Sequence, residues 1–410
     1  MKEPKIRFKG FSGEWKMPKL GDVFEIRNGY TPSKAVSAFW TNGTVPWFRM
    51  EDIRDKGGLL KEAYQKVTQE AVKGGGLFEA NSILLATTAT IGVHAMLIAD
   101  SLANQQFTNL KIRKSLVANY TPMYIYYSFF GIDEWCIKNS NAGGLLSVNM
   151  TELCKLPFLT PSLSEQRTLS SYFTSLDAQI SASTSRLASL KQMKAASLQA
   201  MFPQEGEIVP KVRFKGFEGE WKKVKLNTFA KRIMRKNSNL ESSLALTIAS
   251  AHGLVSQAEY FNNLVVGSNI QNYYLLKKGE FAYNKSYSNG YPFGSVKRLD
   301  RYEQGILSTL YIVFSIDDSV SSDYITHFFD TTLWHKEIAE RAEEGARNHG
   351  LLNIATRDFF DIYIWMPDSV KEQQSIASFF TSLDRQIALH TQRLEKLKQI
   401  KAACLDKMFV

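Results

Sequence analysis

The sequence is poor in the features that carry covalent or redox chemistry. Its three cysteines, Cys136, Cys154 and Cys404, form neither a CxxC pair nor an even disulfide set, which fits a reducing compartment. No apolar run reaches the roughly 18 residues that a membrane span needs, and the first residues hold no apolar signal core. We therefore expect a cytoplasmic protein without a membrane partner.

Catalytic and cofactor motifs are also missing. The sequence contains no Walker A pattern, no HExxH, no cysteine–histidine zinc spacing and no Asn/Asp-Pro-Pro-Tyr/Phe stretch of adenine methyltransferases. The run Gly74-Gly75-Gly76 lacks the G-x-G-x-x-G spacing, so it predicts a turn. The six histidines are scattered. We expect no catalytic residue, no metal site and no cofactor in this chain.

The composition is that of a globular protein, with 44% hydrophobic and 22% charged residues. A length of 410 residues predicts two or three domains. The net charge of +10 and the pI of about 9.2 favour a polyanionic partner, of which nucleic acid is the commonest in a cytoplasm.

The most informative feature is an internal repeat. Residues 5–15 read KIRFKGFSGEW and residues 211–221 read KVRFKGFEGEW; residues 164–180 and 186–202 recur in the same way at 371–387 and 393–409. The stretches between, 16–160 and 222–366, share length and composition but almost no register. The chain therefore contains two copies of one unit, in which a variable domain is enclosed by a common framework.

The repeated segments at 164–203 and 370–410 have the spacing of amphipathic helices. Apolar residues recur at steps of mostly three, four and seven. Residues 164–202 and 370–410 contain no Gly or Pro. We expect the first helix to begin after Pro161 with Ser164 as N-cap, to run from about Glu165 to Met201, and to be roughly 55 Å long.

The narrow apolar stripe of each helix favours another helix as its partner. We predict that the two helices form an antiparallel coiled coil, with polar positions that help to set the register. The alternative, that each helix packs on its own domain, stays open. The predicted helix-pairing residues are Leu169, Phe173, Leu176, Ile180, Leu187, Leu190, Ile376, Phe380, Leu383, Ile387, Leu394 and Leu397.

Both variable domains show short β-type runs separated by Gly, Asn and Pro. We expect strands at 82–88, 93–98, 279–284, 293–299 and 311–314, and helices at 122–137 and 323–344. The predicted fold class is α+β: two globular domains with mostly antiparallel sheets, separated by a long antiparallel two-helix coiled coil. The predicted divisions are a first domain at 1–163, a first spacer helix at 164–203, a second domain at 204–369 and a second spacer helix at 370–410.

This layout resembles the specificity subunit of type I restriction-modification systems. Four motifs carry the resemblance, and the last of them recurs at 365–374: Arg27-Asn28-Gly29-Tyr30-Thr31-Pro32-Ser33-Lys34, Val45-Pro46-Trp47-Phe48, Asn104-Gln105-Gln106-Phe107, and Leu156-Pro157-Phe158 with Glu165-Gln166-Arg167. The second domain departs from the first motif, because residues 230–237 read AKRIMRKN.

The resemblance implies that each domain is a target-recognition domain that reads one half of a split, asymmetric site in double-stranded DNA. It also implies that the paired helices set the unread gap and that the chain docks two methyltransferase subunits and two restriction (motor-nuclease) subunits. S-adenosylmethionine, ATP and Mg²⁺ are then expected on those partners, and this chain is non-catalytic by itself.

Base reading needs polar side chains on loops that reach base edges. The candidate DNA-binding residues of the first domain are Tyr30, Thr31, Ser33, Lys34, Arg49, Thr87, Thr88, Thr90, Gln105, Gln106 and Asn141. Those of the second domain are Arg232, Arg235, Lys236, Lys285, Tyr287, Asn289, Tyr291, Arg347, Asn348 and His349.

Two other functions stay open. The first is an enzyme, a lone methyltransferase or nuclease of unrecognised type, which tight binding of S-adenosylmethionine to the isolated chain would favour. The second is a two-domain protein-binding scaffold without DNA specificity, which an interaction with duplex DNA that is insensitive to salt would favour.

Overall fold

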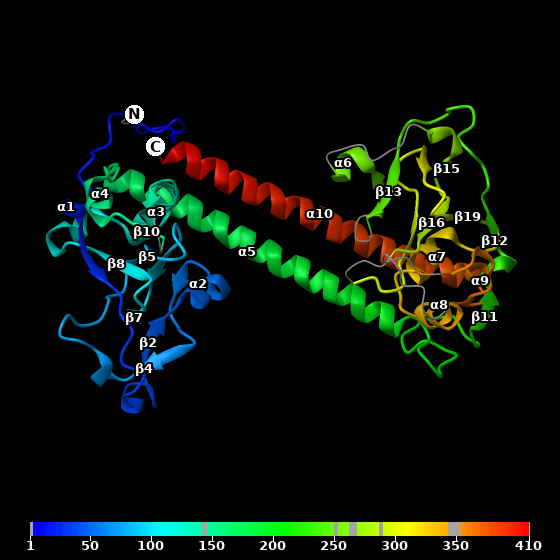
Figure 1. Cartoon of the computed structure of the whole chain (residues 1–410), viewed down its shortest axis with the longest axis horizontal. Coiled ribbons are helices and arrows are strands. Elements are labelled where there is room, and N and C mark those ends of the chain that lie inside the picture. Colours follow the sequence, from blue (N-terminus) through cyan, green and yellow to red (C-terminus); the bar gives the residue numbers. More distant parts are fainter. Residues whose placement is uncertain are drawn as a thin grey trace. The chain divides into compact units, whose positions relative to one another are not determined.

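The structure, a computed structural model, describes residues 3–141, 146–249, 253–261, 269–286, 290–342, 352 and 354–409. The chain divides into two compact units: unit 1 comprises Met1–Thr184 and Gln392–Val410, and unit 2 comprises Ser185–Thr391. The division passes through the two long helices, α5 (Leu163–Ala200) and α10 (Val370–Met408), so each unit contains part of both (Figure 1). The domain limits predicted from the sequence are a different division and stay a prediction.

In its described residues, unit 1 contains a mixed sheet, a smaller sheet and the two-stranded pair β9–β10, beside the helices α1, α2, α3 and α4. The main sheet has the strand order β1-β8-β5-β6-β3, and the smaller sheet the order β4-β2-β7. All pairings are antiparallel except β3 with β6 and β2 with β7. The elements are α1 (Leu20–Val23), β1 (Phe24–Asn28), β2 (Val45–Phe48), α2 (Met50–Lys56), β3 (Leu59–Leu60), β4 (Gln65–Val67), β5 (Ile83–Ala86), β6 (His94–Leu97), β7 (Leu102–Ala103), β8 (Phe107–Ile112), α3 (Pro122–Lys138), β9 (Ser140–Asn141), β10 (Ser147–Val148) and α4 (Met150–Lys155).

Unit 2 is built on a four-stranded antiparallel sheet with the order β12-β19-β16-β17, accompanied by two-stranded pairs. Its elements are β11 (Lys222–Lys225), β12 (Ala230–Arg232), β13 (Leu246–Ala249), β14 (Gly253–Ser256), α6 (Gln257–Phe261), β15 (Tyr274–Lys277), β16 (Phe281–Asn284), β17 (Ser295–Arg298), β18 (Gln304–Leu307), β19 (Ile312–Ile316), α7 (Ser322–Phe328), α8 (His335–Arg341), α9 (Thr356–Phe360) and β20 (Tyr363–Met366).

Each unit has its own core sheet, and the two sheets have the same strand order. The order β1-β8-β5-β6 in unit 1 corresponds to β12-β19-β16-β17 in unit 2, and every pairing within these strands is antiparallel. The α+β class with mostly antiparallel sheets is therefore confirmed. The prediction of a single helix at 323–344 is wrong, because this segment forms two helices, α7 and α8, separated by a turn. In that turn Thr331 Oγ1 donates to Phe328 O at 2.7 Å.

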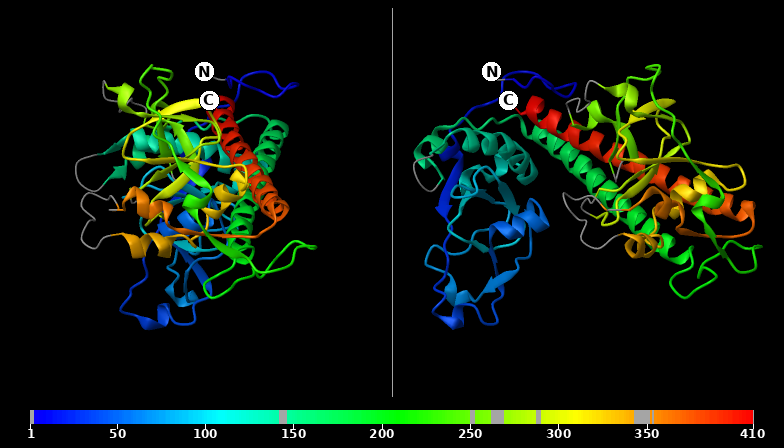
Figure 2. Two further views of the ribbon diagram at one scale, coloured as in Figure 1. Left: turned by 90° about the vertical axis from the view of Figure 1, so that its right-hand side faces the viewer. Right: turned by 45° about the vertical axis from the view of Figure 1, so that its right-hand side comes forward.

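Within each unit the segments of α5 and α10 run antiparallel, side by side (Figure 1 and Figure 2). In unit 1, Phe173 packs on Phe409 with ring centroids 5.5 Å apart, and Asp177 pairs with Lys401 at 2.6 Å. In unit 2, Lys194 pairs with Asp384 at 2.8 Å, and Phe202 packs on Phe380 at 6.0 Å. All twelve predicted helix-pairing residues are buried or half-buried.

The helices also belong to the domain cores. Leu169, Phe173 and Met408 lie in the core of unit 1, and Phe202, Ile376 and Phe380 lie in that of unit 2, among other residues. The beginning of each helix thus packs on its own domain and meets the end of the other helix there. The two packing alternatives raised by the sequence are both realised, at different turns of the same helices. None of the described helices has the length and apolarity of a membrane span.

The repeated framework clamps the start of each helix. Arg7 donates from Nε and Nη2 to the carboxylate of Glu165 at 2.7 and 2.8 Å, and Arg213 donates in the same way to Glu372 at 2.6 and 2.8 Å. Both glutamates are buried. Each arginine also binds the carbonyl of a glycine in its own segment, Gly13 or Gly219, at 2.6 Å. The sequence repeats RFKGF and Glu-Gln because each half of the chain forms the same arginine–glutamate clamp.

The predicted N-cap Ser164 is wrong, because α5 begins at Leu163. Ser162 caps it instead: its hydroxyl accepts from Glu165 N at 3.3 Å, and its carbonyl accepts from Gln166 N at 2.9 Å. Ser369 makes the matching bond to Glu372 N at 3.4 Å in α10. The spacing Ser-x-x-Glu suits this role because N-cap hydroxyls satisfy the free amides of the first turn.

Candidate nucleic-acid interface

In unit 1 the loop that follows β1, beginning at Gly29, lies against the turn that precedes β8. Thr31 Oγ1 donates to Gln105 Oε1 at 2.5 Å, and the amides of Gly29 and Tyr30 donate to Phe107 O and Ala103 O at 2.7 and 2.8 Å. A Cβ atom on Gly29 would lie 2.0 Å from the Asn104 carbonyl oxygen, so only glycine permits this approach. Two polar loops far apart in the sequence are thereby held together.

The loop between β5 and β6 joins the same surface. The Thr87 amide donates to Gln106 O at 3.0 Å, and Thr88 forms a bridge with Ser147, whose strand partner is Asn141. Thr87 is buried, and its hydroxyl lies 2.8 Å from that of Thr108, so its side chain supports the loop from within. Thr90 is half-buried, with its amide bonded to Thr88 O. Most of the candidate residues of the first domain are therefore brought into one polar loop surface.

The remaining candidates of unit 1 lie on either side of this surface. Ser33 and Lys34 are exposed. The Tyr30 hydroxyl is engaged internally: it donates to Ala71 O at 3.1 Å and accepts from Lys73 N at 2.9 Å. Arg49 pairs with Glu51, and its guanidinium carbon lies over the Trp47 ring, 5.9 Å from the ring centroid. Among these residues, Ser33 and Lys34 retain the freest polar groups.

The turn before β8 has a counterpart in unit 2 that the sequence comparison did not find. The Asn104 side chain accepts from Gln106 N at 3.1 Å, and its carbonyl accepts from Phe107 N at 3.2 Å. The Ser308 side chain accepts from Leu310 N at 3.3 Å, and its carbonyl accepts from Tyr311 N at 3.2 Å. Asn104-Gln105-Gln106-Phe107 and Ser308-Thr309-Leu310-Tyr311 thus form the same side-chain-capped turn, each leading into a matching central strand.

Thr309 and Leu310 are accordingly the candidates that the sequence analysis missed. Their signal was positional rather than chemical: a Ser or Asn three residues before the aromatic residue that leads into the strand. Because the two turns share no side chain, only the matching strand order and hydrogen bonds reveal them.

The other candidates of unit 2 differ in how freely they are exposed. Arg232 is exposed on β12. Arg235 is engaged, since it pairs with Glu280 at 2.5 Å and donates to Leu275 O at 3.1 Å. The Lys236 ammonium lies 3.9 Å from the centre of the Tyr274 ring. Lys285 and Tyr291 are half-buried in the loop between β16 and β17. Five candidates lie outside the described residues: Tyr287, Asn289, Arg347, Asn348 and His349.

Beneath the β5–β6 loop of unit 1 lies a buried histidine–aspartate pair. His94 Nδ1 is 2.5 Å from Asp133 Oδ2, and His94 Nε2 is 2.9 Å from the Tyr126 carbonyl oxygen. Because a carbonyl oxygen only accepts hydrogen bonds, His94 Nε2 donates to the Tyr126 carbonyl. Burial raises the pKa of Asp133, although the hydrogen bond and charge of His94 oppose the shift.

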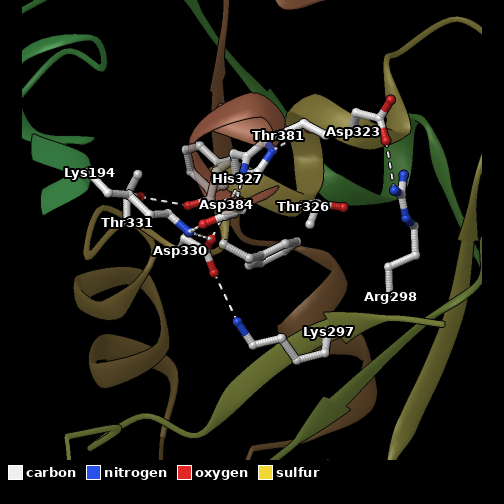
Figure 3. A network of polar contacts seen from close by, with 12 residues as sticks. Lys194, Lys297, Arg298, Asp323, Thr326, His327, Asp330, Thr331, Thr381 and Asp384 are labelled. Carbon is white, nitrogen blue, oxygen red and sulfur yellow. Dashed lines mark hydrogen bonds and ion pairs between the residues drawn. The ribbon is translucent and has the colours of Figure 1, made fainter. Parts of the chain in front are cut away.

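Unit 2 contains a polar network with metal-like geometry. Ligand atoms of His327, Asp330 and Asp384 lie within 4.8 Å of one another. However, Lys194 lies 2.9 Å from Asp330 and 2.8 Å from Asp384, and Lys297 lies 2.9 Å from Asp330 (Figure 3). Burial opposes ionisation, but His327 and the two lysines outweigh it and hold the pKa of Asp330 well below its usual range. The ammonium groups of the two lysines neutralise the two carboxylates. The cluster is therefore an ion-pair network that joins α5, α10 and β17 of unit 2.

Comparison with known proteins identifies one family over most of the chain. The model of the family described as "Type I restriction modification DNA specificity domain" matches residues 12–192 and 218–399. The specificity subunit of the type I restriction enzyme EcoprrI from Escherichia coli is 47% identical over 152 residues, which are 37% of this chain and 37% of that protein. The MjaIX specificity subunit of Methanocaldococcus jannaschii is 27% identical over 169 residues, or 40% of this chain and 38% of that one.

Each match therefore spans well under half of the relative's length. Among solved structures, the S subunit of the type-I restriction-modification system from M. genitalium superimposes with a TM-score of 0.63 at 12% identity, covering 100% of this chain and 99% of that one. This likeness concerns the fold.

Proposed function

Because this chain belongs to the family of type I restriction-modification DNA specificity domains, we propose that it is the specificity subunit of such an enzyme and reads a bipartite, asymmetric DNA site. Each unit reads one half-site in double-stranded DNA. The chain itself performs no chemistry. It works in the cytoplasm with two methyltransferase subunits and two restriction subunits. Those partner subunits bind S-adenosylmethionine, ATP and Mg²⁺.

The observation that carries this proposal is the contrast between scaffold and surface. Both units have the same core sheet and the same capped turn before the central strand, but the turns present Gln105 and Gln106 in one unit and Thr309 and Leu310 in the other. Specific DNA contacts depend on which groups meet the base edges. Two like scaffolds with unlike side chains suit two readers of unlike sequences.

The paired helices suit the role of a spacer that sets the unread gap. Asp177 precedes Lys194 on α5 by the same number of residues as Asp384 precedes Lys401 on α10, and Asp177–Lys401 and Lys194–Asp384 are both ion pairs. These pairs are compatible with one antiparallel register. A buried or half-buried polar pair disfavours slippage of the helices, because a shifted register would leave charges unpaired.

Methylation mapping tests the proposal. The chain is expressed with the methyltransferase subunit of its own host, and modified adenines are located across the genome. We expect one split, non-palindromic motif that disappears when this chain is omitted. Persistence of the motif without the chain would contradict the proposal.

Binding at different salt concentrations separates DNA reading from protein scaffolding. For a DNA reader, the logarithm of the affinity for duplex falls linearly with the logarithm of salt concentration, with a slope of about −0.9 for each neutralised phosphate. A scaffold that binds only proteins gives no such dependence.

A further inference from the structure

Leu310 is the most exposed large apolar side chain among the described residues, at 64% relative exposure. Single exposed leucines are ordinary on protein surfaces, so exposure alone carries no conclusion. What distinguishes Leu310 is its place: it occupies the position of Gln106, in the turn that the two units share.

The turn holds the backbone of Leu310 in place. The Ser308 hydroxyl accepts from the Leu310 amide at 3.3 Å, and the Ser308 carbonyl accepts from the Tyr311 amide at 3.2 Å. Tyr311 anchors the turn from below, since it packs on the apolar cluster of β13, β15 and β19 and its hydroxyl lies 3.4 Å from Thr247 Oγ1. Because the backbone of the turn is already ordered, a ligand that covers Leu310 restricts mainly the rotamers of its side chain.

The chemistry of the side chain limits what it can recognise. Leucine has no donor or acceptor, so it distinguishes base pairs only through apolar contact. In the major groove, the one apolar group on the edge of an unmodified base is the 5-methyl group of thymine. A leucine at a base-reading position therefore selects thymine over cytosine by shape and burial rather than by hydrogen bonding.

We propose that Leu310 is a specificity-determining residue that contacts the 5-methyl group of a thymine in the half-site read by unit 2. This inference rests on the proposed function, because it requires that unit 2 binds DNA through the loops around its central strand. It names one base and one atom of that base, and it gives the two half-sites different modes of recognition: amide groups at Gln105 and Gln106, and an apolar group at Leu310.

Deoxyuridine provides the direct test, because it differs from thymidine only by the missing 5-methyl group. After the target has been mapped, duplexes are made in which each thymine of the unit 2 half-site is replaced by deoxyuridine, one at a time. Binding is measured with the chain assembled with its methyltransferase subunits. We expect one replacement to weaken binding about 4-fold, the factor that corresponds to burial of one methyl-sized group at about 0.8 kcal/mol.

The variant Leu310→Ala makes the test specific. It should bind the thymine duplex about as weakly as the wild type binds the deoxyuridine duplex, and it should lose the sensitivity to that one replacement. Leu389→Ala is the matched control, because Leu389 is 56% exposed on α10, outside the loops; it should keep the wild-type sensitivity. Unfolding curves of both variants confirm that they fold.

The outcomes separate this inference from the proposed function. If the complex binds no mapped site specifically, the proposed function fails. If it binds specifically but no deoxyuridine replacement affects it, or if Leu310→Ala keeps the full sensitivity, the assignment of Leu310 is overturned. A unit 2 half-site without any A·T pair would overturn it as well.

Discussion

At the scale of single residues, the clamps Arg7–Glu165 and Arg213–Glu372 explain the most conspicuous sequence repeat. In each clamp a planar guanidinium binds a carboxylate through two hydrogen bonds and reaches a backbone carbonyl as well. Such bidentate pairs are strong because both partners are charged and their geometries match. The clamp ties the segment that opens each half to the first turn of the long helix.

Loss of Arg213 should destabilise unit 2. Arg213→Ala leaves the carboxylate of Glu372, which is only 1% exposed, without its charge partner, and we expect the free energy of unfolding to fall by about 3 kcal/mol. Denaturant unfolding measures this change. Adding Glu372→Gln should recover part of the loss, because no buried charge then remains. Arg232→Ala, at an exposed arginine, should change stability by under about 0.5 kcal/mol; an equal effect of the two alanine variants would argue against the clamp.

The pair His94–Asp133 should make the stability of unit 1 depend on pH. Because burial raises the folded-state pKa of Asp133, its contribution to stability is complete below the ordinary carboxyl pKa of about 3.9 and is lost as the pH rises through the raised value. The free energy of unfolding of the wild type, relative to Asp133→Asn, should therefore decrease as the pH rises above about 4. Urea unfolding at a series of pH values tests this, and a difference that grows with pH would refute it.

At the scale of secondary-structure elements, the long helices combine two kinds of packing. Their first turns belong to a domain core, whereas Asp177, Lys194, Asp384 and Lys401 form ion pairs between the helices. Lys194 also pairs with Asp330, whereas Asp177 accepts a hydrogen bond from Tyr127 at 2.9 Å. The same helix pair is thus fastened to each domain through different side chains.

Shortening both helices tests the spacer role. Removal of residues 181–187 together with the matching residues 388–394 takes one heptad, about 10 Å, from each helix and keeps the apolar stripe in phase. We expect methylation mapping to show both half-sites unchanged and the gap shortened by about three base pairs. Removal of five residues from each helix is the control: it rotates the stripe by about 140° and should prevent pairing. Altered half-sites in the heptad variant would contradict the spacer role.

At the scale of the whole molecule, the chain is two versions of one scaffold whose loops carry different side chains. If each unit reads its half-site independently, replacement of residues 222–366 by the variable domain of another family member should change one half-site and leave the other intact. The reciprocal replacement of residues 16–160 should change only the other half-site. Methylation mapping of both chimaeras gives the answer, and a change in both half-sites of either chimaera would show that the units do not read separately.

Much of the fold was predictable because its signals are local. The heptad spacing marked α5 and α10, and short β-type runs separated by Gly, Asn and Pro marked β5, β6, β16, β17 and β19. The helix predicted at 323–344 failed because apolar periodicity continues through Phe328, Phe329 and Trp334, although the backbone turns there. Periodicity records which residues face a core, and both a continuous helix and two short helices satisfy it.

The candidate site was predictable as a set of loops but not as a set of available side chains. Thr31 and Gln105 do lie together, and Ser33, Lys34 and Arg232 are exposed. Tyr30, Thr87 and Arg235 are engaged by Ala71, Thr108 and Glu280, partners that no spacing rule indicates. Whether a polar group is free depends on its neighbours in space, which lie tens of residues away in the sequence.

The sequence by itself determined the duplication, the two long helices, the α+β class and the resemblance to a family of DNA readers, because repeats and periodicity are properties of neighbouring residues. Only the tertiary structure decided that Arg7 and Arg213 hold buried glutamates, that Ser162 caps α5, and that Ser308–Tyr311 is the counterpart of Asn104–Phe107. These are long-range pairings or backbone geometries shared by unlike side chains. They follow from how the sheets bring distant segments together.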